Sequence, residues 1–339
     1  AVVVGVGRFG ALHVRVWREA GAEVVGLCDV DGDRLTQVAE RSAIDTVDTD
    51  ATALIERSRP DVVVIATDEH THVDVAVTAL EAGCHVFVEK PLALNGADAK
   101  HIREASAAAG RHVVTGQISR FAAPYRRMRS SLRDGRIGEL LALRLRRDFS
   151  RAWFAAFGSR VHPVWESCIH DIDLAIGFAG RPAERVMAMQ SDAAGDAAAS
   201  VVAGIFELEG GILATIESAW LVPEAAPQTI SGAIELEGSI VGEAELLGSS
   251  GLIRQRLVSD SLVEWTPQGV YVPDLSLWPE DSDAVGGALR SEVDYALTVF
   301  QGHRANDLMP LSEACWGVEA AEAMVRSLET GAPVEVERH

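Results

Sequence analysis

Short aliphatic runs alternate with helical patterns along the first 115 residues of the chain. We expect strands at 1–4, 23–28, 46–47, 61–66, 85–88 and 112–115, with helices between them, for example at 9–20 and 73–82. Near-continuous Val and Ile runs are typical of strands that are buried on both faces. The pattern therefore predicts a doubly wound parallel sheet covered by helices on both sides.

The pattern changes after residue 117. A helix up to Gly135, an alternating strand at 140–149, an aromatic loop at 151–164 and a helix at 165–178 come first. Successive strands without helices between them follow, and such a run indicates a largely antiparallel sheet. We expect these strands at 201–208, 212–220, 229–237, 239–247 and 252–258, then helices at 287–301 and 311–329 and a last strand at 333–337.

Two domains are expected from this change of pattern. Residues 1–117 are expected to form the doubly wound domain, and residues 118–339 an α/β domain with a large open, mostly antiparallel sheet. An open apolar sheet face is usually buried between subunits, so the second domain is expected to form a subunit interface.

The amino-acid composition limits the kinds of molecule that the protein is expected to bind. The chain of 339 residues has 50 acidic and 30 basic residues and a net charge of −20, which disfavours nucleic acid and anionic membranes as partners. No apolar run approaches the length of a membrane span. The four cysteines form no C-x-x-C pair, which is typical of reduced thiols and predicts a cytoplasmic protein.

A glycine-rich turn follows the first strand run, in Gly5-Val6-Gly7-Arg8-Phe9-Gly10. Gly5 allows the tight turn, Gly7 lets a pyrophosphate approach the backbone, and Gly10 lets helix and strand pack closely. The helix that starts here directs its N-terminus at the anion. Asp29 ends the second strand run, where a carboxylate binds ribose hydroxyls and repels a 2′-phosphate. The motif predicts NAD as cofactor, bound by Gly5, Gly7, Arg8, Phe9, Gly10 and Asp29.

A lysine stands at the end of the fifth strand run, in Glu89-Lys90-Pro91. Only two of the 30 basic residues are lysines, Lys90 and Lys100, and a lysine can exchange a proton where an arginine cannot. The carboxyl ends of such strands face the ligand crevice. We therefore expect Lys90 to bind a substrate hydroxyl and Glu89 to orient it, with Pro91 fixing the backbone in a turn that can include a cis bond.

A third set of polar residues lies on the helix expected at 165–178. Glu166, His170 and Asp173 have the spacing i, i+4, i+7, which places them on one helix face. Neutral His170 can accept a hydroxyl proton as a general base, with Asp173 or Glu166 fixing its tautomer, and a carboxylate on this stripe can bind substrate hydroxyls. The alternative is a solvated charged face.

Other chemistries find less support in the sequence. His70 and His72 flank Thr71, and Glu166 and His170 have helical ligand spacing, but neither pair completes a three-ligand set, so no metal is expected. The chain has no G-x-S-x-G elbow of a serine hydrolase.

Taken together, the three motifs resemble the Gfo/Idh/MocA oxidoreductase family. The resemblance also rests on 60–72, 79–83, 85–91, Gly116, Arg120-Phe121, the Gly135-x-Ile137-Gly138 segment and His170-Asp171-Ile172-Asp173. It implies an NAD-binding Rossmann domain followed by an α/β domain for substrate binding and oligomerisation, with a large open sheet. It also implies an NAD-dependent dehydrogenase or reductase that acts on CH–OH groups of a sugar, a cyclitol or a derivative, with dimers or tetramers formed through the open sheet.

Roles for single residues carry over from the same resemblance. Lys90 matches the catalytic lysine and His170 the active-site histidine, and the stripe adds Glu166 and Asp173 to the catalytic set. Thr67, His72, Glu89 and Lys90 match cofactor-side positions, and Arg120 matches a position near nicotinamide and substrate. The expected substrate-binding residues are Arg120, Trp153, Glu166, His170 and Asp171.

Two positions depart from the pattern of the family. Thr67-Asp68-Glu69 stands where many members have Thr-Pro-Asn, and Glu166 stands where inositol-dehydrogenase-like members have Asp. Two other functions are compatible with the fold. One is a glycosidase that holds NAD for transient oxidation, and the other is a non-catalytic NAD-binding sensor, which has no need of Lys90 or His170.

Overall fold

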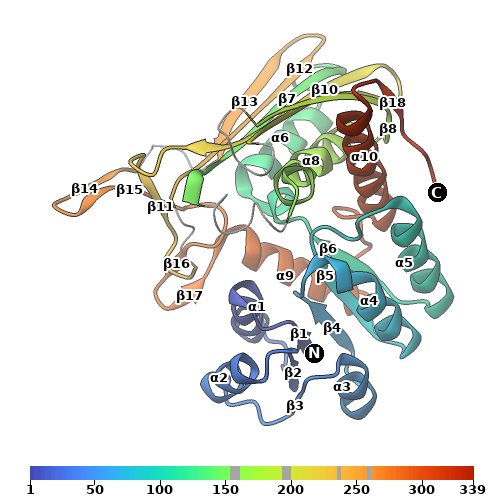
Figure 1. The fold of residues 1–339 in the computed structure, drawn as a ribbon, viewed down its shortest axis with the longest axis vertical. Helices are drawn as coiled ribbons and strands as arrows, with labels where there is room; N and C mark the ends of the chain where they lie inside the picture. The colour runs from blue at the N-terminus through green and yellow to red at the C-terminus, as the bar shows by residue number, and fades with distance from the viewer. Residues whose placement is uncertain (153–160, 193–199, 235–237, 258–261) are drawn as a thin grey trace.

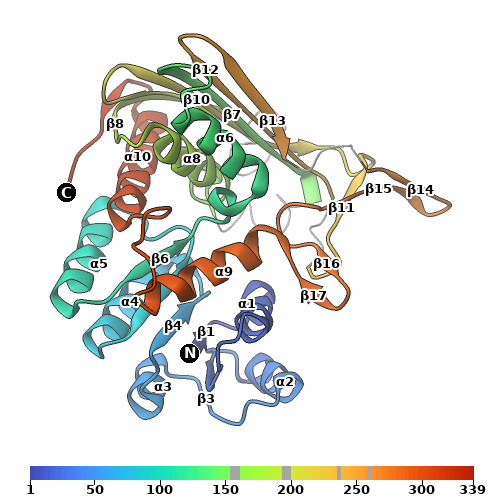
Figure 2. The same cartoon turned by 180° about the vertical axis from the view of Figure 1, so that it is seen from behind.

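Two sheets organise the chain (Figures 1 and 2). The structure is a computed structural model and describes residues 1–152, 161–192, 200–234, 238–257 and 262–339. The first sheet has six parallel strands in the order β3-β2-β1-β4-β5-β6. These strands are β1 (Val2–Val4), β2 (Gly26–Cys28), β3 (Val47–Asp48), β4 (Val62–Ile65), β5 (His85–Glu89) and β6 (Val113–Gly116). The predicted doubly wound sheet is confirmed.

Helices connect these strands and cover both faces of the sheet (Figure 1). Their starts follow from local chemistry, since the side chains of Asp31, Asp50 and Asn95 accept backbone N–H groups at the first turns of α2, α3 and α5. The helical elements of this half are α1 (Arg8–Glu19), α2 (Gly32–Ser42), α3 (Ala51–Ser58), η1 (Glu69–Thr71), α4 (His72–Glu81), α5 (Gly96–Ala109) and η2 (Ile118–Phe121).

The second sheet has seven strands in the order β13-β12-β7-β10-β9-β8-β18. Strands β7 and β10 pair in parallel and the other neighbours are antiparallel, so the expectation of a mostly antiparallel sheet is confirmed. The strands are β7 (Leu140–Ser150), β8 (Ala183–Ser191), β9 (Val201–Leu208), β10 (Ile212–Val222), β12 (Ile240–Gly248), β13 (Leu252–Leu257) and β18 (Val334–Glu335).

Among the described residues, α6, α8, α9, α10 and a π-helical turn accompany this sheet. α6, α8 and α10 lie on one of its faces, and α9 runs between them and the first sheet (Figures 1 and 2). α9 packs on α1 and η2, and α10 packs on α5, so both late helices join the two halves. These elements are α6 (Ala123–Arg133), the π-helical turn η3 (Val164–Cys168), α8 (Ile169–Ala179), α9 (Gly287–Phe300) and α10 (Leu311–Thr330).

One strand prediction was wrong in its bounds, and the observed strand belongs to a different sheet from the one expected. The run at 229–237 forms only the short strand β11 (Gln228–Ile230), and residues 235–237 lie outside the described part. Gly232 has φ +84, a left-handed conformation that ends the extended run. β11 pairs with β15 (Gly269–Pro273), which also pairs with β14 (Glu264–Thr266), in a small sheet that extends away from the body (Figure 1). A two-stranded sheet of β16 (Glu280–Asp281) and β17 (Ala284–Val285) lies next to α1.

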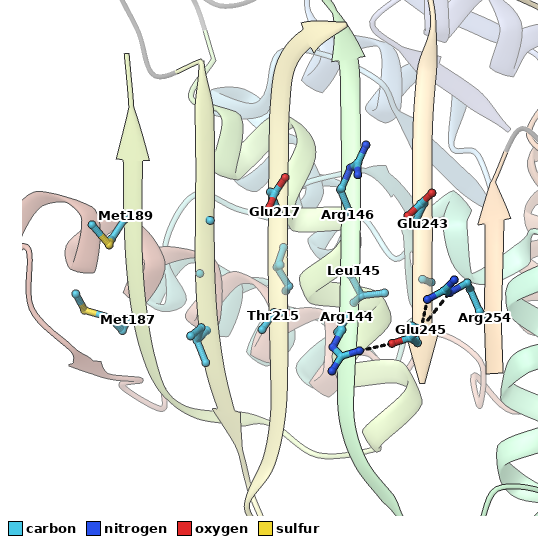
Figure 3. A pocket seen from close by; sticks show the side chains of 15 residues that line it. Arg144, Leu145, Arg146, Met187, Met189, Thr215, Glu217, Glu243, Glu245 and Arg254 are labelled. Atoms are coloured by element: carbon cyan, nitrogen blue, oxygen red, sulfur yellow. Dashed lines mark hydrogen bonds and ion pairs between the residues drawn. The ribbon is translucent and has the colours of Figure 1, made fainter. Parts of the chain in front are cut away.

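The outer face of the seven-stranded sheet forms a shallow depression of about 500 Å³ (Figure 3). Aligned strand positions place charges of opposite sign side by side, with Glu245 between Arg144 and Arg254. Met189 and Ile205 lie toward the other edge and are 71% and 55% exposed. This face therefore combines apolar area with a patterned set of charges.

None of the helices in the described residues is both long and apolar enough to cross a lipid bilayer.

Candidate functional site

The glycine turn joins β1 to α1 and leaves space for a ligand above its middle glycine. Gly5 has φ +84, and a Cβ there would lie 2.6 Å from the carbonyl carbon of Ala66. A Cβ on Gly10 would lie 1.9 Å from the Gly5 carbonyl oxygen, so helix and turn are in direct contact. Around Gly7, in contrast, an added Cβ would meet nothing within 4 Å among the described residues. This open space at a helix N-terminus fits a pyrophosphate.

Asp29 lies beside this turn at the end of β2. The side chain is 7% exposed, and its two oxygens accept the backbone N–H groups of Val6 at 2.8 Å and Asp31 at 2.9 Å. Arg34 approaches the same carboxylate at 3.5 Å. The carboxylate therefore braces the glycine turn at the position where a ribose is expected. Arg8 is exposed at the first turn of α1, and Phe9 packs edge-on against Trp278 of the second half, with ring centroids 5.4 Å apart.

Lys90 links the two halves of the molecule at the end of β5. Its Nζ donates to Glu166 Oε2 at 2.8 Å and to the Glu166 carbonyl oxygen at 3.2 Å. Both side chains are mostly buried, with 17% and 18% of their surface exposed. The Lys90–Pro91 peptide bond is cis. The structure thus brings together two of the residues predicted for the site, which lie 76 positions apart in the chain.

His170 lies at the start of α8, in the electrostatic field of Lys90. Burial, and then the positive charges of Arg147 and Lys90, hold the pKa of its imidazole well below the ordinary value. Its Nδ1 is buried and has no hydrogen-bond partner in the part of the chain that the structure describes. His170 is therefore neutral near pH 7 and able to accept a proton.

The other two acidic residues of this helix are engaged by arginines. Asp173 is 1% exposed, and its oxygens accept hydrogen bonds from Arg120 at 2.6 and 2.8 Å. Arg120 also donates to Glu313 at the start of α10. The expected hydrogen bond from the His170 imidazole to the Asp173 carboxylate is not seen among the described residues, and the carboxylate instead accepts from Arg120 in this buried ion pair. A Cβ on Gly177 would lie 2.8 Å from the guanidinium carbon of Arg120, so a glycine there makes room for the pair.

Asp171 is likewise buried, and its carboxylate is bound by Arg147 of β7 at 2.9 and 3.2 Å. Both members of this pair have 5% or less of their side chain exposed. The expected single polar stripe is thus divided. Glu166 lies in the π-helical turn and faces Lys90, while Asp171 and Asp173 fix α8 to its neighbours.

Sequence reasoning missed the partner of Glu89. His13 of α1 is fully buried, and its Nε2 lies 2.7 Å from Glu89 Oε1. The second oxygen of Glu89 accepts the backbone N–H of Lys90 at 3.2 Å. A histidine on the apolar side of an amphipathic helix gave no signal of this pairing, and only the fold brings α1 and the end of β5 together.

Thr67 and His72 follow β4 and hold the loop that connects β4 to α4. The buried His72 donates from Nδ1 to the Pro91 carbonyl oxygen at 2.7 Å. Its Nε2 lies 3.3 Å from the carbonyl oxygen of Thr67. Burial lowers the pKa of His72, so its ring is neutral and ties the ends of two strands together. Thr67 is half-buried and accepts a hydrogen bond from the Thr71 hydroxyl.

Two further predictions concern the surroundings of the site. Trp153, expected to bind substrate, lies outside the described residues. In the exposed loop after β4, Asp68, Glu69 and His70 each place one possible ligand atom within 4.8 Å of the others. Exposed acidic groups are common without a bound ion, and nothing else in the described residues points to a metal at this loop.

The fold has a parallel sheet with a glycine turn of the dinucleotide-binding type, followed by a mostly antiparallel sheet, and Lys90 of the first half is ion-paired with Glu166 of the second. Two family models match most of the sequence. Residues 1–117 match the family described as "Oxidoreductase family, NAD-binding Rossmann fold", and residues 125–253 match the "GFO/IDH/MocA C-terminal domain". The chain belongs to the Gfo/Idh/MocA oxidoreductase family, as the motifs predicted.

Curated relatives with names include several inositol dehydrogenases. Inositol 2-dehydrogenase of Salmonella typhimurium is 32% identical over 178 residues, which is 51% of this chain and 52% of the relative. The chain thus spans about half the length of the first of these relatives. Inositol 2-dehydrogenase 1 of Saccharopolyspora erythraea is 28% identical over 99% of this chain and 95% of the relative.

The fold is shared with solved structures over nearly the whole chain. Scyllo-inositol dehydrogenase from Lactobacillus casei, solved with NAD(H) and scyllo-inositol, superposes with a TM-score of 0.81 at 20% identity. The match covers 99% of this chain and 98% of that one. At this identity the likeness establishes the architecture.

Proposed function

We propose that the protein is an NAD-dependent dehydrogenase that oxidises a CH–OH group of a cyclitol, a sugar or a related polyol, or reduces the ketone in reverse. The observation that carries the proposal is the Lys90–Glu166 pair beside neutral His170, at the end of a strand whose sheet also carries the glycine turn. The family match and the inositol 2-dehydrogenase relatives support this substrate class.

The residues present fit the cofactor. The open space at Gly7 suits the pyrophosphate, and Asp29 at the end of β2 suits ribose hydroxyls and disfavours a 2′-phosphate. When bound, the nicotinamide ring accepts or supplies the hydride. Gly5, Gly10, Arg8 and Phe9 shape the turn, whereas Thr67, His72 and Glu89 position the strand ends around it.

The chain itself handles the proton and the substrate oxygen. Lys90 donates a hydrogen bond to the substrate hydroxyl and stabilises the alkoxide that develops there. Neutral His170 accepts the proton of the substrate hydroxyl. The positive charges of Lys90 and Arg147 oppose protonation of His170 in the free site, and the negative charge that develops on the substrate oxygen offsets this opposition. Glu166 keeps Lys90 in place and can bind a second hydroxyl, while Arg120, Asp171 and Asp173 hold α8 rigid through buried ion pairs.

A direct test mixes the purified protein with NAD or NADP and a panel of cyclitols, sugars and amino sugars, and follows the absorbance of reduced nicotinamide. We expect NAD reduction with a subset of polyols and weaker use of NADP. Calorimetry in the same samples measures cofactor binding by itself. Binding of NAD without reduction by any polyol, and without oxidation of NADH by the matching ketones, would refute the dehydrogenase assignment.

We further propose that a second copy of the chain covers the open face of the seven-stranded sheet, giving a homodimer or homotetramer. The exposed Met189 and Ile205 and the alternating charges of Arg144, Glu245 and Arg254 support this. Light scattering of a Met189→Glu/Ile205→Glu variant is expected to show a smaller assembly, whereas Leu275→Glu, at another exposed apolar position, retains the native one. A monomeric wild-type protein would overturn the proposal.

The cytoplasm is the proposed location. All four cysteines are free and buried, which fits a protein kept in a reducing compartment.

A further inference from the structure

The segment that connects β15 to α9 crosses to the first half of the molecule and lies along α1. Residues 274–285 form this segment, called the strap below, and it includes the hairpin of β16 and β17 (Figures 1 and 2). Arg15 of α1 donates to the carboxylate of Glu280 at 2.8 Å. Glu19, about one turn further along the helix, accepts the backbone N–H of Val285 at 3.0 Å. The second half is thus bonded to the helix that begins at the glycine turn.

Trp278 is the strap residue that contacts the glycine turn. Its ring packs edge-on against Phe9 with ring centroids 5.4 Å apart, and Phe9 in turn packs on His13 at 5.5 Å. Phe9 is the second residue of α1. The N–H groups of a first helical turn have no carbonyl partner within the helix, and these are the groups that bind a phosphate. Trp278 therefore contacts a side chain of the turn at which the pyrophosphate is expected.

The strap holds Trp278 in one orientation. The residue is 6% exposed, and its Nε1 donates to the Ile234 carbonyl oxygen at 3.0 Å. Its backbone N–H donates to the buried carboxylate of Asp274 at 2.8 Å. The same carboxylate accepts the backbone N–H groups of Ser276 and Leu277, also at 2.8 Å. Because the tryptophan is fixed at its backbone and at its indole nitrogen, its ring gives the neighbouring phenylalanine a rigid support.

We propose that Trp278 is a positioning residue for cofactor binding: its ring holds Phe9, and through Phe9 the first turn of α1, in the place where that turn binds the pyrophosphate. The inference rests on the proposed function, in which the glycine turn binds NAD. Binding groups lose affinity when the side chains that support them no longer hold them in position. A residue of the second half, outside the three sequence motifs, thereby contributes to the affinity of the first half for the dinucleotide.

The test measures binding in the full chain and needs no turnover. Calorimetry gives the dissociation constants of NAD and of ADP, which shares the adenosine and the pyrophosphate of NAD but lacks its nicotinamide half. Trp278→Leu removes the aromatic ring, whereas Trp278→Phe keeps a ring and loses only the indole hydrogen bond. Trp265→Leu is the control, because Trp265 of β14 is a tryptophan of the same half that is 78% exposed.

We expect Trp278→Leu to bind NAD and ADP about tenfold more weakly, the upper range of what an edge-on aromatic pair contributes. Trp278→Phe should stay within about threefold of the wild type for both ligands, since it retains the ring contact. Trp265→Leu should bind both ligands as the wild type does.

Two results would overturn the inference. One is an unchanged affinity of Trp278→Leu, or a loss for NAD alone, because the pyrophosphate is common to both ligands. The other is an equal loss in Trp278→Phe and Trp278→Leu, which would assign the effect to the hydrogen bond with Ile234. If Trp278→Leu does not fold, Phe9→Leu, which removes the contact from the other side, must weaken NAD and ADP by the same factor.

Hydrogen exchange of the cofactor-free protein gives the second readout. The amides of residues 11–14 donate to carbonyl groups of the first turn, as Ala11 does to Gly7 at 2.8 Å. In Trp278→Leu they should exchange about tenfold faster than in the wild type, while the amides of α5 exchange as before. Equal acceleration in α5 would indicate general destabilisation and would refute the positioning role, as would unchanged exchange at 11–14.

The same measurements separate this inference from the proposed function. A wild type that binds neither NAD nor ADP would refute the proposed cofactor, and this inference with it. A wild type that binds both ligands, together with an unchanged Trp278→Leu, would refute the inference alone and leave the dehydrogenase assignment in place.

Discussion

Removal of the Lys90 amine gives the most direct test of the site. Lys90→Met keeps the length of the aliphatic chain but deletes the Nζ that donates to the Glu166 carboxylate at 2.8 Å and to its carbonyl oxygen at 3.2 Å. Catalysis by a positioned acid or base typically contributes about 10²–10⁴-fold. At about 1.36 kcal/mol per tenfold change, the variant should lose about 2.7–5.4 kcal/mol of transition-state stabilisation.

Lys90→Met should lower the free energy of unfolding by less than the total stability of the domain. A hydrogen bond between charged groups contributes about 1.5–3 kcal/mol, and this pair retains some exposure to screening solvent. Since domains are stable by about 5–15 kcal/mol, Lys90→Met is expected to remain folded. NAD affinity should change little, because the glycine turn and Asp29 lie on other strands.

The assay is the initial rate of NAD reduction under saturating substrate, with NAD affinity measured separately by calorimetry. Lys100→Met is the matched control, since Lys100 is the only other lysine of the sequence and its Nζ lies 3.9 Å from a Glu104 carboxylate oxygen on the exposed side of α5. A Lys90→Met enzyme that turns over within about threefold of the wild type would refute the assignment, since the expected loss is at least about 10²-fold.

Three further substitutions test the rest of the site. Asp29→Ser removes the carboxylate that accepts two backbone N–H groups. Calorimetry should then show that NADH binds about 10–100-fold more weakly and that the ratio of NADPH affinity to NADH affinity is higher. An unchanged ratio would mean that Asp29 does not face the ribose. Arg147→Leu leaves Asp171 buried and unpaired, and denaturant unfolding should show a loss of about 3–5 kcal/mol in the free energy of unfolding. The double variant Arg147→Leu/Asp171→Leu should recover part of this loss. Equal losses in both variants would contradict the assignment of a buried ion pair. Because the pKa of His170 is lowered in the folded state, the unfolded chain binds more protons than the folded chain below about pH 6.5. The free energy of unfolding should therefore fall by about 1.36 kcal/mol for each unit by which the pH is lowered in this range. In His170→Gln, this component of the pH dependence should be absent.

The fold was predictable because its signals are local. Near-continuous valine runs such as Val2–Val4 and Val62–Ile65 can only be accommodated as strands covered on both faces, and the glycine turn marks the crossover to the first helix. The strand expected at 229–237 failed for a local reason too, since the positive φ of Gly232 ends the extended run. The aliphatic residues around it gave a pattern that does not distinguish one sheet from another.

The sequence indicated several residues that the fold brings together, but it did not indicate how they pair. Spacing alone placed Glu166, His170 and Asp173 on one face, but a π-helical turn at Val164–Cys168 precedes the α-helix and directs Glu166 toward Lys90. The partners of the other carboxylates, Arg120 and Arg147, come from elements at least 24 positions away. A helical period carries no information on such long-range pairs, so they had to come from the fold.

The glutamate at position 166 explains how the lysine is held in this chain. Inositol-dehydrogenase-like sequences have the shorter aspartate there, whereas here the longer side chain reaches Nζ while its own carbonyl oxygen accepts a second hydrogen bond. The Lys90 ammonium is thus fixed by the second half of the molecule through Glu166, and its main chain is fixed by the first half through Glu89. Because neither half holds the lysine alone, we expect the packing of α9 between them to influence the position of the Lys90 side chain. A change at that interface should therefore alter turnover before it alters cofactor binding.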